Sequence, residues 1–215
     1  LNRVGGTVRM VGDAVAMVLA ETPELALAAA EAVRVDYEPL PSIYDPVEAM
    51  DPGAVPLYPQ GNVLGTYTIV HGDLETAEAT HAIDGSLVLE THYNTPYLEH
   101  SALERETVLS YWDKEDRLTV VGGHQEPHWA RDWTARMLAL PPEQVRVIVP
   151  PMGGAFGGKQ DPWPLMAAAL AAYHAPERRP VRLTYSRRES FDASPKRHPY
   201  RMHYRIGARP GGTLI

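Results

Sequence analysis

The chain has no cysteine among its 215 residues. It therefore has no disulfides, no thiolate zinc site, no iron–sulfur cluster held by its own side chains and no catalytic thiol. It also lacks a long hydrophobic run. Its apolar stretches are rich in alanine and are interrupted within about ten residues, whereas a helix that spans a bilayer needs about 20. We expect a soluble, cytoplasmic protein without membrane contacts.

Charge is unevenly distributed along a chain of ordinary globular composition, 44% hydrophobic and 22% charged. Residues 1–116 hold 20 acidic and 5 basic side chains, whereas residues 117–215 hold 7 acidic and 15 basic ones. The basic excess lies mainly in residues 178–209. Without an aromatic-interleaved motif, this excess favours a solvated face, a contact with an acidic neighbouring region or a nearby anionic cofactor over nucleic acid. A non-catalytic interaction module that uses the basic region remains an alternative.

The first fifty residues have the pattern strand, helix, strand. Residues 11–20 form an apolar run with branched side chains, and residues 33–37 alternate as in a half-buried strand. Between them, Thr22 is a suitable N-cap for an Ala-rich helix over residues 23–34 that begins with proline. Residues 45–65 hold four prolines, which predicts an extended linker.

The remainder predicts a mixed sheet with two helices. The turn-forming residues 113–117 separate two apolar segments and indicate a β-hairpin. Strands are expected over residues 86–94, 108–112, 118–121, 145–149, 181–185 and 201–206.

The two helices of this region are expected over residues 127–140 and 163–173. The second is rich in alanine. In the first, large apolar side chains recur at helical spacing and predict a core-facing stripe. The stripe consists of Trp129, Trp133, Met137 and Leu140.

Residues 153–159, Gly-Gly-Ala-Phe-Gly-Gly-Lys, are the most unusual segment. Four glycines in six residues leave backbone N–H groups free to approach a ligand, and Phe156 must project from the loop as a wall for something flat. Read literally, Gly153 to Lys159 match the G-x-x-x-x-G-K of a phosphate-binding loop. Gln160 stands where that loop needs Ser or Thr, and two prolines delay the next helix. A nucleotide-binding P-loop and a tight turn without a ligand are the alternatives.

With these motifs in this order, the chain resembles the molybdenum-binding subunit of the xanthine dehydrogenase and aldehyde oxidase family. Residues 11–16 and 35–41, with the helix between them, are similar to the later part of that family's α/β hammerhead domain. Landmarks of its first molybdopterin-binding domain are residues 72–73, 100–104, 125–128, 150–159 and 196–199. The resemblance implies an α+β fold, with the end of the hammerhead domain at residues 1–50, an extended linker at 51–80 and an incomplete molybdopterin-binding domain at 81–215.

The resemblance also implies roles for single residues. Gln125 corresponds to a glutamine beside the metal's oxo ligand, where an amide N–H₂ donates a hydrogen bond without adding charge; capping of the following helix is its structural alternative. The loop residues Gly153, Gly154, Phe156 and Gly157 would contact the cofactor. Lys159 is expected to bind either the anionic cofactor or a carboxylate.

Other polar residues receive structural or substrate roles. His100 and Glu104 are expected to be buried structural groups, and the resemblance implies no protein ligand to the metal. Gln160 stands where xanthine-oxidising members carry a glutamate that faces the substrate. Its amide therefore favours another N-heteroaromatic compound or an aldehyde as substrate.

The implied activity is hydroxylation with oxygen from water. The cofactor would be molybdopterin, either as such or as a dinucleotide, with iron–sulfur clusters and FAD on other subunits or domains. The general-base glutamate is expected outside residues 1–215, so no catalytic residue is assigned here. We expect a fragment of a larger hetero-oligomer, inactive by itself and without nucleic acid partners.

Overall fold

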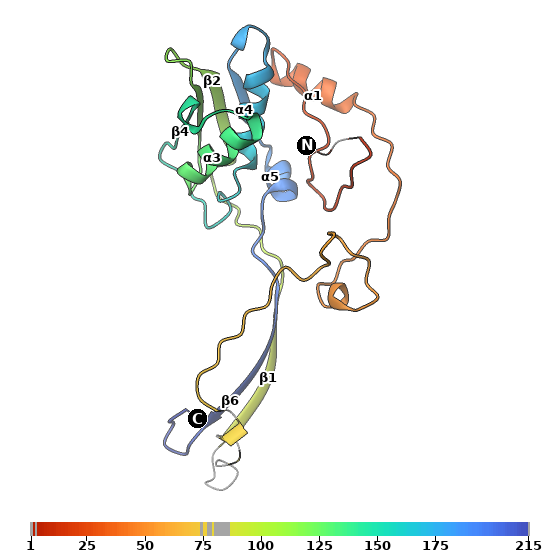
Figure 1. Ribbon diagram of the computed structural model, residues 1–215, viewed down its shortest axis with the longest axis vertical. Coiled ribbons are helices and arrows are strands. Elements are labelled where there is room, and N and C mark those ends of the chain that lie inside the picture. The colour runs from red at the N-terminus through yellow and green to blue at the C-terminus, as the bar shows by residue number, and fades with distance from the viewer. Residues whose placement is uncertain (1, 3, 74, 77–78, 80–86, 215) are drawn as a thin grey trace. The chain divides into compact units, whose positions relative to one another are not determined.

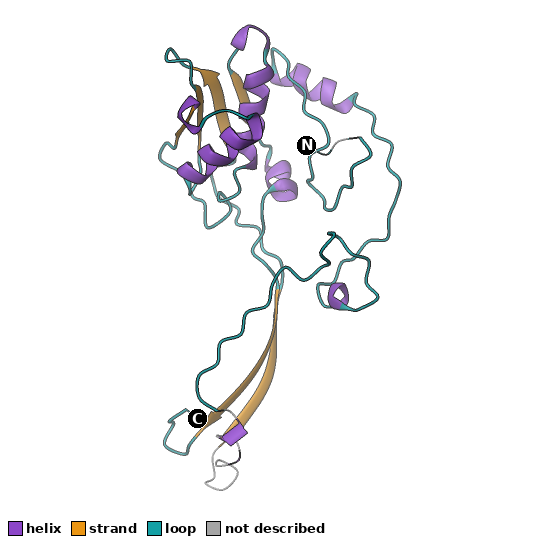
Figure 2. Cartoon of the chain, viewed as in Figure 1, coloured by secondary structure: helices purple, strands orange, loops and turns teal. Residues whose placement is uncertain are grey.

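The computed structural model describes residues 2, 4–73, 75–76, 79 and 87–214. The chain divides into two units, and each consists of two segments of the sequence. The first unit is Leu1–Val35 with Tyr97–His198, and the second is Asp36–Pro96 with Pro199–Ile215. Figure 1 colours the chain by residue number, and Figure 2 marks its helices and strands.

A four-stranded mixed sheet forms the centre of the first unit. The strands are β2 (Thr107–Trp112), β3 (Leu118–Gly122), β4 (Val145–Ile148) and β5 (Val181–Thr184), in the order β4-β3-β2-β5. β3 pairs antiparallel with β2 and parallel with β4, and β2 pairs antiparallel with β5. The predicted hairpin is thereby confirmed.

Asp113 organises the hairpin turn. Its carboxylate accepts hydrogen bonds from the backbone N–H groups of Glu115 and Arg117, both at 3.0 Å, and from the Thr119 hydroxyl at 2.9 Å. An aspartate that binds backbone N–H groups shortly after itself stabilises a turn locally. This explains why the sequence pattern alone located the turn correctly.

Helices α3 (Pro127–Leu138) and α4 (Trp163–His174) pack against this sheet (Figure 2). α4 contacts β2, β3 and β5, while α3 contacts β4 and α4. Alanine predominates on α4, and its small side chains allow a close approach to the strands. The buried core consists of Val108, Leu118, Val120, Ala130, Leu138, Leu165, Ala168, Ala169 and Ala172.

The predicted apolar stripe on α3 is partly wrong. Met137 and Leu140 do pack against the core, but Trp129 and Trp133 are 43% and 41% exposed. The buried face of the helix is formed instead by Ala130, Thr134, Ala135 and Leu138. Helical spacing finds residues that share a face but does not tell which face meets the sheet, and here the smaller side chains lie inside.

The N-terminal segment contains α1 (Pro23–Glu31), and the Thr22 hydroxyl caps it by accepting a hydrogen bond from Leu25 N at 3.3 Å. This helix is confirmed, although it ends earlier than predicted. The strands predicted over residues 11–20 and 33–37 are wrong, because neither segment belongs to a sheet. A strand requires a partner for its backbone hydrogen bonds, and neither segment pairs with a strand in the part of the chain that the structure describes.

Helix α5 (Arg187–Ala193) was not predicted. Ser186 and Glu189 form a reciprocal capping box at its N-terminus, with the Ser186 hydroxyl accepting from Glu189 N at 3.1 Å. The sequence pattern Ser-x-x-Glu carried this signal. Short 3-10 helices occur at Glu48–Met50, Pro142–Gln144 and Pro176–Arg178.

A two-stranded antiparallel ribbon is the regular part of the second unit. It pairs β1 (Leu87–Thr95) with β6 (Tyr200–Ala208). Both strands were predicted, but their pairing was not. Of these predictions, Ser86 lies outside the described residues, as do positions 74, 77–78 and 80 of the predicted linker. Residues 51–73 form turns and irregular backbone. Nowhere in the described chain is a helix long and apolar enough to cross a membrane.

Candidate functional site

The glycine-rich loop, residues 153–159, connects the end of β4 to α4 in the first unit. At its centre, Phe156 has a φ of 55° and its side chain is 76% exposed. Left-handed backbone costs a bulky residue about 1 kcal/mol or more, and the exposed ring gains little packing in return. A strained, exposed aromatic residue of this kind is typical of a ligand-binding loop.

Gly154 permits this arrangement. Its φ is 101°, and a Cβ at this position would lie 3.1 Å from Cε2 of Phe156. Any other residue would therefore strain the backbone and press against the aromatic ring. Gly154 and Phe156 thus form one structural feature.

The backbone of the loop offers unused hydrogen-bond donors. Gly158 N donates to Ala155 O at 2.9 Å, and Gly153 N and Lys159 N donate to side chains. The N–H groups of Gly154 to Gly157 have no acceptor among the described residues. Successive free N–H groups in a glycine-rich loop are suited to the oxygens of an anionic ligand. Of the loop residues that the resemblance assigned to a cofactor, Gly154, Phe156 and Gly157 therefore have free N–H groups, whereas Gly153 N is already bound to a side chain.

Glu104 and Lys159 hold the two ends of the loop. Glu104 Oε2 accepts a hydrogen bond from Gly153 N, and Glu104 Oε1 lies 3.2 Å from Nζ of Lys159. The Lys159 side chain is 2% exposed. Burial raises the pKa of Glu104, but the Gly153 N–H and the Lys159 ammonium outweigh it, so that the pKa is lowered. Of the two roles expected for Lys159, the structure has the ion pair.

This ion pair also contradicts the P-loop alternative. In a P-loop the lysine reaches the ligand's phosphates, whereas here its ammonium group is buried against Glu104. Helix α4 begins only at Trp163, and its N-cap is Pro162, which provides no side-chain hydrogen bond. The loop therefore lacks the free lysine of a nucleotide-binding P-loop.

His100 packs against the last two glycines of the same loop. A Cβ at Gly158 would lie 2.8 Å from His100 Nδ1, and a Cβ at Gly157 would lie 3.4 Å from Nε2. His100 and Glu104 were predicted to be buried structural groups. Both contact the loop, but each is only half-buried, so the burial part of the prediction is wrong. The segment that carries them is not helical. No sequence pattern indicated that both residues contact the loop.

Gln125 is fixed by the end of the loop. Its backbone N–H donates to Lys159 O at 2.9 Å, and its side-chain Oε1 accepts from Lys159 N at 3.3 Å. Because Oε1 must face that N–H, the Nε2 group points elsewhere, and it has no acceptor among the described residues. Helix α3 has Glu126 as its N-cap and no side-chain cap, so the expected structural alternative for Gln125 is not observed.

Gln160 lies near the same place. Its Nε2 donates to Oε1 of Glu126 at 3.3 Å, and both side chains are exposed. The Oε1 of Gln160 remains available as an acceptor. A glutamate at position 160 would bring two carboxylates together, so the amide suits the neighbouring Glu126.

His124 is a buried residue that stabilises the segment around Gln125 and Glu126. Its ring is 1% exposed, and Nδ1 accepts a hydrogen bond from Glu126 N at 2.9 Å. Burial lowers the pKa of His124, although backbone groups of Gln160 and Glu126 oppose that effect. His124 is therefore a neutral structural group, and no sequence pattern indicated this role.

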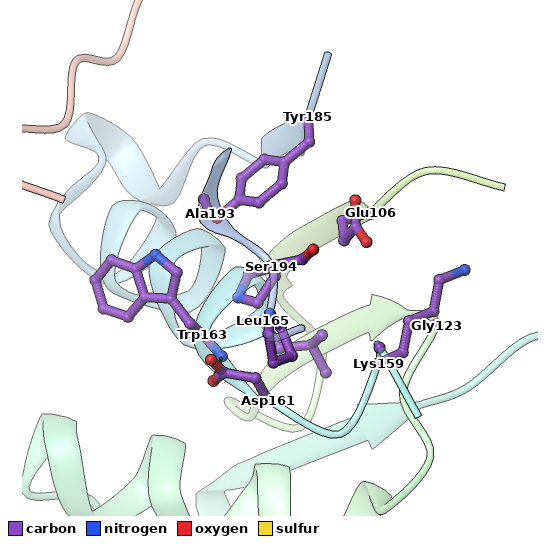
Figure 3. A pocket seen from close by; sticks show the side chains of 12 residues that line it. Glu106, Gly123, Lys159, Asp161, Trp163, Leu165, Tyr185, Ala193 and Ser194 are labelled. Atoms are coloured by element: carbon purple, nitrogen blue, oxygen red, sulfur yellow. Dashed lines mark hydrogen bonds between the residues drawn. The ribbon is translucent and has the colours of Figure 1, made fainter. Parts of the chain in front are cut away.

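A small cavity lies next to the end of the loop (Figure 3). Figure 3 shows Glu106, Asp161, Trp163 and Tyr185 around it. Its free volume is about 10 Å³, which is enough for about one water molecule but not for a cofactor. Burial, together with the charges of Glu106, Asp161 and Glu189, raises the pKa of Tyr185 to about 12. The exposed side of the loop, rather than this cavity, is the candidate site.

Basic residues of the region 117–215 pair with acidic residues of the region 1–116. Of the three alternatives for the basic excess, these pairs support a contact with an acidic region. The pairs are Arg178 with Asp116, Arg179 with Glu21, Lys196 with Glu99 and Arg201 with Asp45. Among the residues that the structure describes, no three His, Asp or Glu side chains gather in a way that could hold a metal ion.

Comparison with protein families identifies the chain. A family model described as "Molybdopterin cofactor-binding domain" matches residues 57–215, and one described as "Aldehyde oxidase and xanthine dehydrogenase, a/b hammerhead domain" matches residues 4–41. The chain belongs to this molybdopterin-binding family. The expected fold, the end of a hammerhead domain followed by a molybdopterin-binding domain of helices and sheet, is confirmed.

Individual relatives support this family assignment. The chain is 37% identical to the "Nicotinate dehydrogenase large molybdopterin subunit" of Eubacterium barkeri over 98% of this chain and 48% of the relative. It is 34% identical to the "Xanthine dehydrogenase molybdenum-binding subunit" of Escherichia coli O157:H7 over 96% of this chain and 27% of the relative. The solved structure of an aldehyde oxidoreductase from Desulfovibrio gigas matches with a TM-score of 0.77 and 26% identity, covering 91% of this chain and 21% of that one. The chain thus spans half or less of the length of these relatives.

Proposed function

We propose that this chain forms one side of the molybdenum-cofactor site of a molybdenum hydroxylase. The observation that carries the proposal is the run of free N–H groups from Gly154 to Gly157, displayed beside the exposed ring of Phe156. No acceptor in the described part of the chain occupies these donors, and the strained backbone at Phe156 keeps the ring exposed. The family match to a molybdopterin-binding domain names the ligand that fits them.

Each residue of the site has a defined task. The backbone of Gly154, Phe156 and Gly157 donates hydrogen bonds to oxygens of the cofactor, with Gly153 as the fixed start of the loop. Gln125 donates through Nε2, because Lys159 N already binds its Oε1. As a neutral donor, Gln125 would stabilise negative charge on an oxygen of the bound cofactor without introducing a counter-charge.

When bound, the cofactor supplies the two-electron oxidation of a substrate carbon, with oxygen from water. The chain's own part is to hold the cofactor and to place donors and an aromatic wall around it. We assign no general base to this chain. That residue would come from outside residues 1–215, as would the iron–sulfur clusters and FAD that receive the electrons.

The substrate we propose is an N-heteroaromatic compound or an aldehyde. In this proposal the Gln160 amide faces the substrate. Its Nε2 donates a hydrogen bond to Oε1 of Glu126 at 3.3 Å, which holds the amide in place. An amide recognises ring nitrogens and oxygens by hydrogen bonding without a charge. The names of the relatives, nicotinate dehydrogenase and xanthine dehydrogenase, support a substrate of this class.

The proposal is tested on the complete natural protein. Molybdenum and pterin are measured in the purified protein, which is then incubated with nicotinate, xanthine and benzaldehyde in ¹⁸O-labelled water. We expect molybdenum and pterin in proportion to the protein, and label in the product of at least one substrate. A protein that contains neither molybdenum nor pterin, or an oxidised product without label from water, would refute the proposal.

The role of Gln125 is tested separately. Gln125→Ala removes one donor and should lower kcat by roughly 10²-fold to 10³-fold, since single donors of this kind contribute that much. Gln144→Ala is a matched control, because Gln144 precedes β4 and lies at the opposite end of that strand from the loop. Equal kcat values for the two variants would contradict the role of Gln125.

A further inference from the structure

We propose that Glu104 is a positioning residue, which sets the conformation of the glycine-rich loop from both of its ends before any ligand binds. The identity of the ligand rests on the proposed function. The role of Glu104 in fixing the loop conformation does not depend on the ligand, because every contact involved lies within this chain.

Glu104 contacts both ends of the glycine-rich loop, and we call this set of contacts the clamp. Glu104 N donates to Gly153 O at 3.2 Å, while Oε2 of the same residue accepts from Gly153 N. Its Oε1 lies 3.2 Å from Lys159 Nζ, at the other end of the loop. One residue thus joins the first and last residues of the loop and closes it into a ring.

Lys159 makes the clamp specific. Its ammonium group is buried and makes no hydrogen bond in the described structure, and Glu104 is the carboxylate that forms an ion pair with it, at 3.2 Å. A buried charge without a partner is strongly unfavourable, so Lys159 draws Glu104 into place. Lys159 also binds Gln125 through both its N–H and its carbonyl group, which ties the proposed donor to the same clamp.

The bound N–H groups give a readout that does not depend on activity. Gly153 N, Gly158 N and Lys159 N each have an acceptor, so their hydrogens should exchange slowly with solvent in the cofactor-free protein. If Glu104 positions the loop, its removal must accelerate exchange at all three. A residue that only contributes to global stability would accelerate exchange equally throughout the first unit.

Glu99 and Lys196 provide a matched control pair. Glu99 Oε2 lies 2.8 Å from Lys196 Nζ and accepts from the Ser194 hydroxyl at 3.1 Å. Burial raises the pKa of Glu99, but Lys196 and the other donors lower it more strongly, as at Glu104. The pair therefore has similar chemistry in the same unit, without a hydrogen bond to the loop.

The experiment measures residue-resolved hydrogen exchange on the complete natural protein without cofactor. Glu104→Ala should accelerate exchange at Gly153, Gly158 and Lys159 at least tenfold relative to the β2–β3 hairpin. Glu99→Gln should leave these three unchanged. The variant Glu104→Gln with Lys159→Met keeps an acceptor for Gly153 N and removes the buried charge, so it should restore slow exchange at Gly153.

Loop exchange that is unchanged in Glu104→Ala, or that is accelerated as much in Glu99→Gln, overturns the inference. If Glu104→Ala does not fold, the double variant decides: fast exchange at Gly153 in that folded protein also overturns it. Cofactor retention is measured in parallel and should fall at least tenfold in Glu104→Ala. A wild-type protein without molybdenum and pterin would refute the proposed function alone, because the exchange comparison still decides the role of Glu104.

Discussion

Replacing Gly158 with alanine should destabilise the first unit through a steric clash with His100. The added Cβ would lie 2.8 Å from His100 Nδ1, 3.1 Å from its Cγ and 3.2 Å from Ala155 O. Gly158 does not have a positive φ, so the backbone itself tolerates alanine. The imidazole is a rigid ring, and the Ala155 carbonyl is fixed by its hydrogen bond from Gly158 N at 2.9 Å. One of these groups must therefore move.

The magnitude follows from two opposing effects. Overpacking of this kind costs about 1–3 kcal/mol, whereas replacing glycine with alanine stabilises by about 0.4–1 kcal/mol through the unfolded chain. We expect the free energy of unfolding to fall by roughly 0–2.6 kcal/mol. In a His100→Ala background the clash with the ring is gone, so the same substitution should cost about zero or stabilise slightly. The coupling between the two positions is then about 1–3 kcal/mol.

The assay is urea unfolding followed by tryptophan fluorescence, because all four tryptophans, Trp112, Trp129, Trp133 and Trp163, lie in the first unit. The control is the same substitution in the His100→Ala background, where the added Cβ no longer meets the imidazole ring. If Gly158→Ala costs the same with and without His100, the steric reasoning is wrong.

Three further predictions concern the core, the loop and pH. Leu165→Ala, at a position 1% exposed in the core, should lower the free energy of unfolding by about 2–5 kcal/mol, whereas Leu27→Ala, at a position 62% exposed on α1, should change it by less than about 0.5 kcal/mol in the same urea assay. Phe156→Gly should leave thermal stability unchanged or raised, because it relieves a positive φ, while molybdenum content falls; unchanged content would contradict a role in cofactor binding. Because the folded pKa of His124 is lowered, the free energy of unfolding should decrease as pH falls through about 6.5, and His124→Gln should show a shallower decrease in urea titrations between pH 8 and 5.

Sequence patterns located the elements whose stability depends on neighbouring residues. Thr22 caps α1 through Leu25, three positions along, and Asp113 binds N–H groups within its own turn. Such interactions recur wherever the local pattern occurs, so propensity and turn chemistry sufficed for them. The capping box of α5 was equally local and could have been found by the same reasoning.

Sequence patterns did not predict contacts between residues that are far apart in the chain. The strand-like segments of residues 11–20 and 33–37 have the right composition but no partner strand among the described residues. On α3, the spacing of Trp129 and Trp133 predicted a shared face correctly, but which face meets the sheet depends on the neighbouring elements.

By itself, the sequence of this protein determined its family, its glycine-rich loop and the residues around it, because motif order along the chain is a property of the sequence. Only the tertiary structure decided what Lys159 does, and it excluded the P-loop alternative. Gly153 and Glu104 are 49 residues apart in the chain, and only folding brings them together. Once they meet, the penalty for an unpaired buried ammonium group commits Lys159 to Glu104 rather than to a ligand.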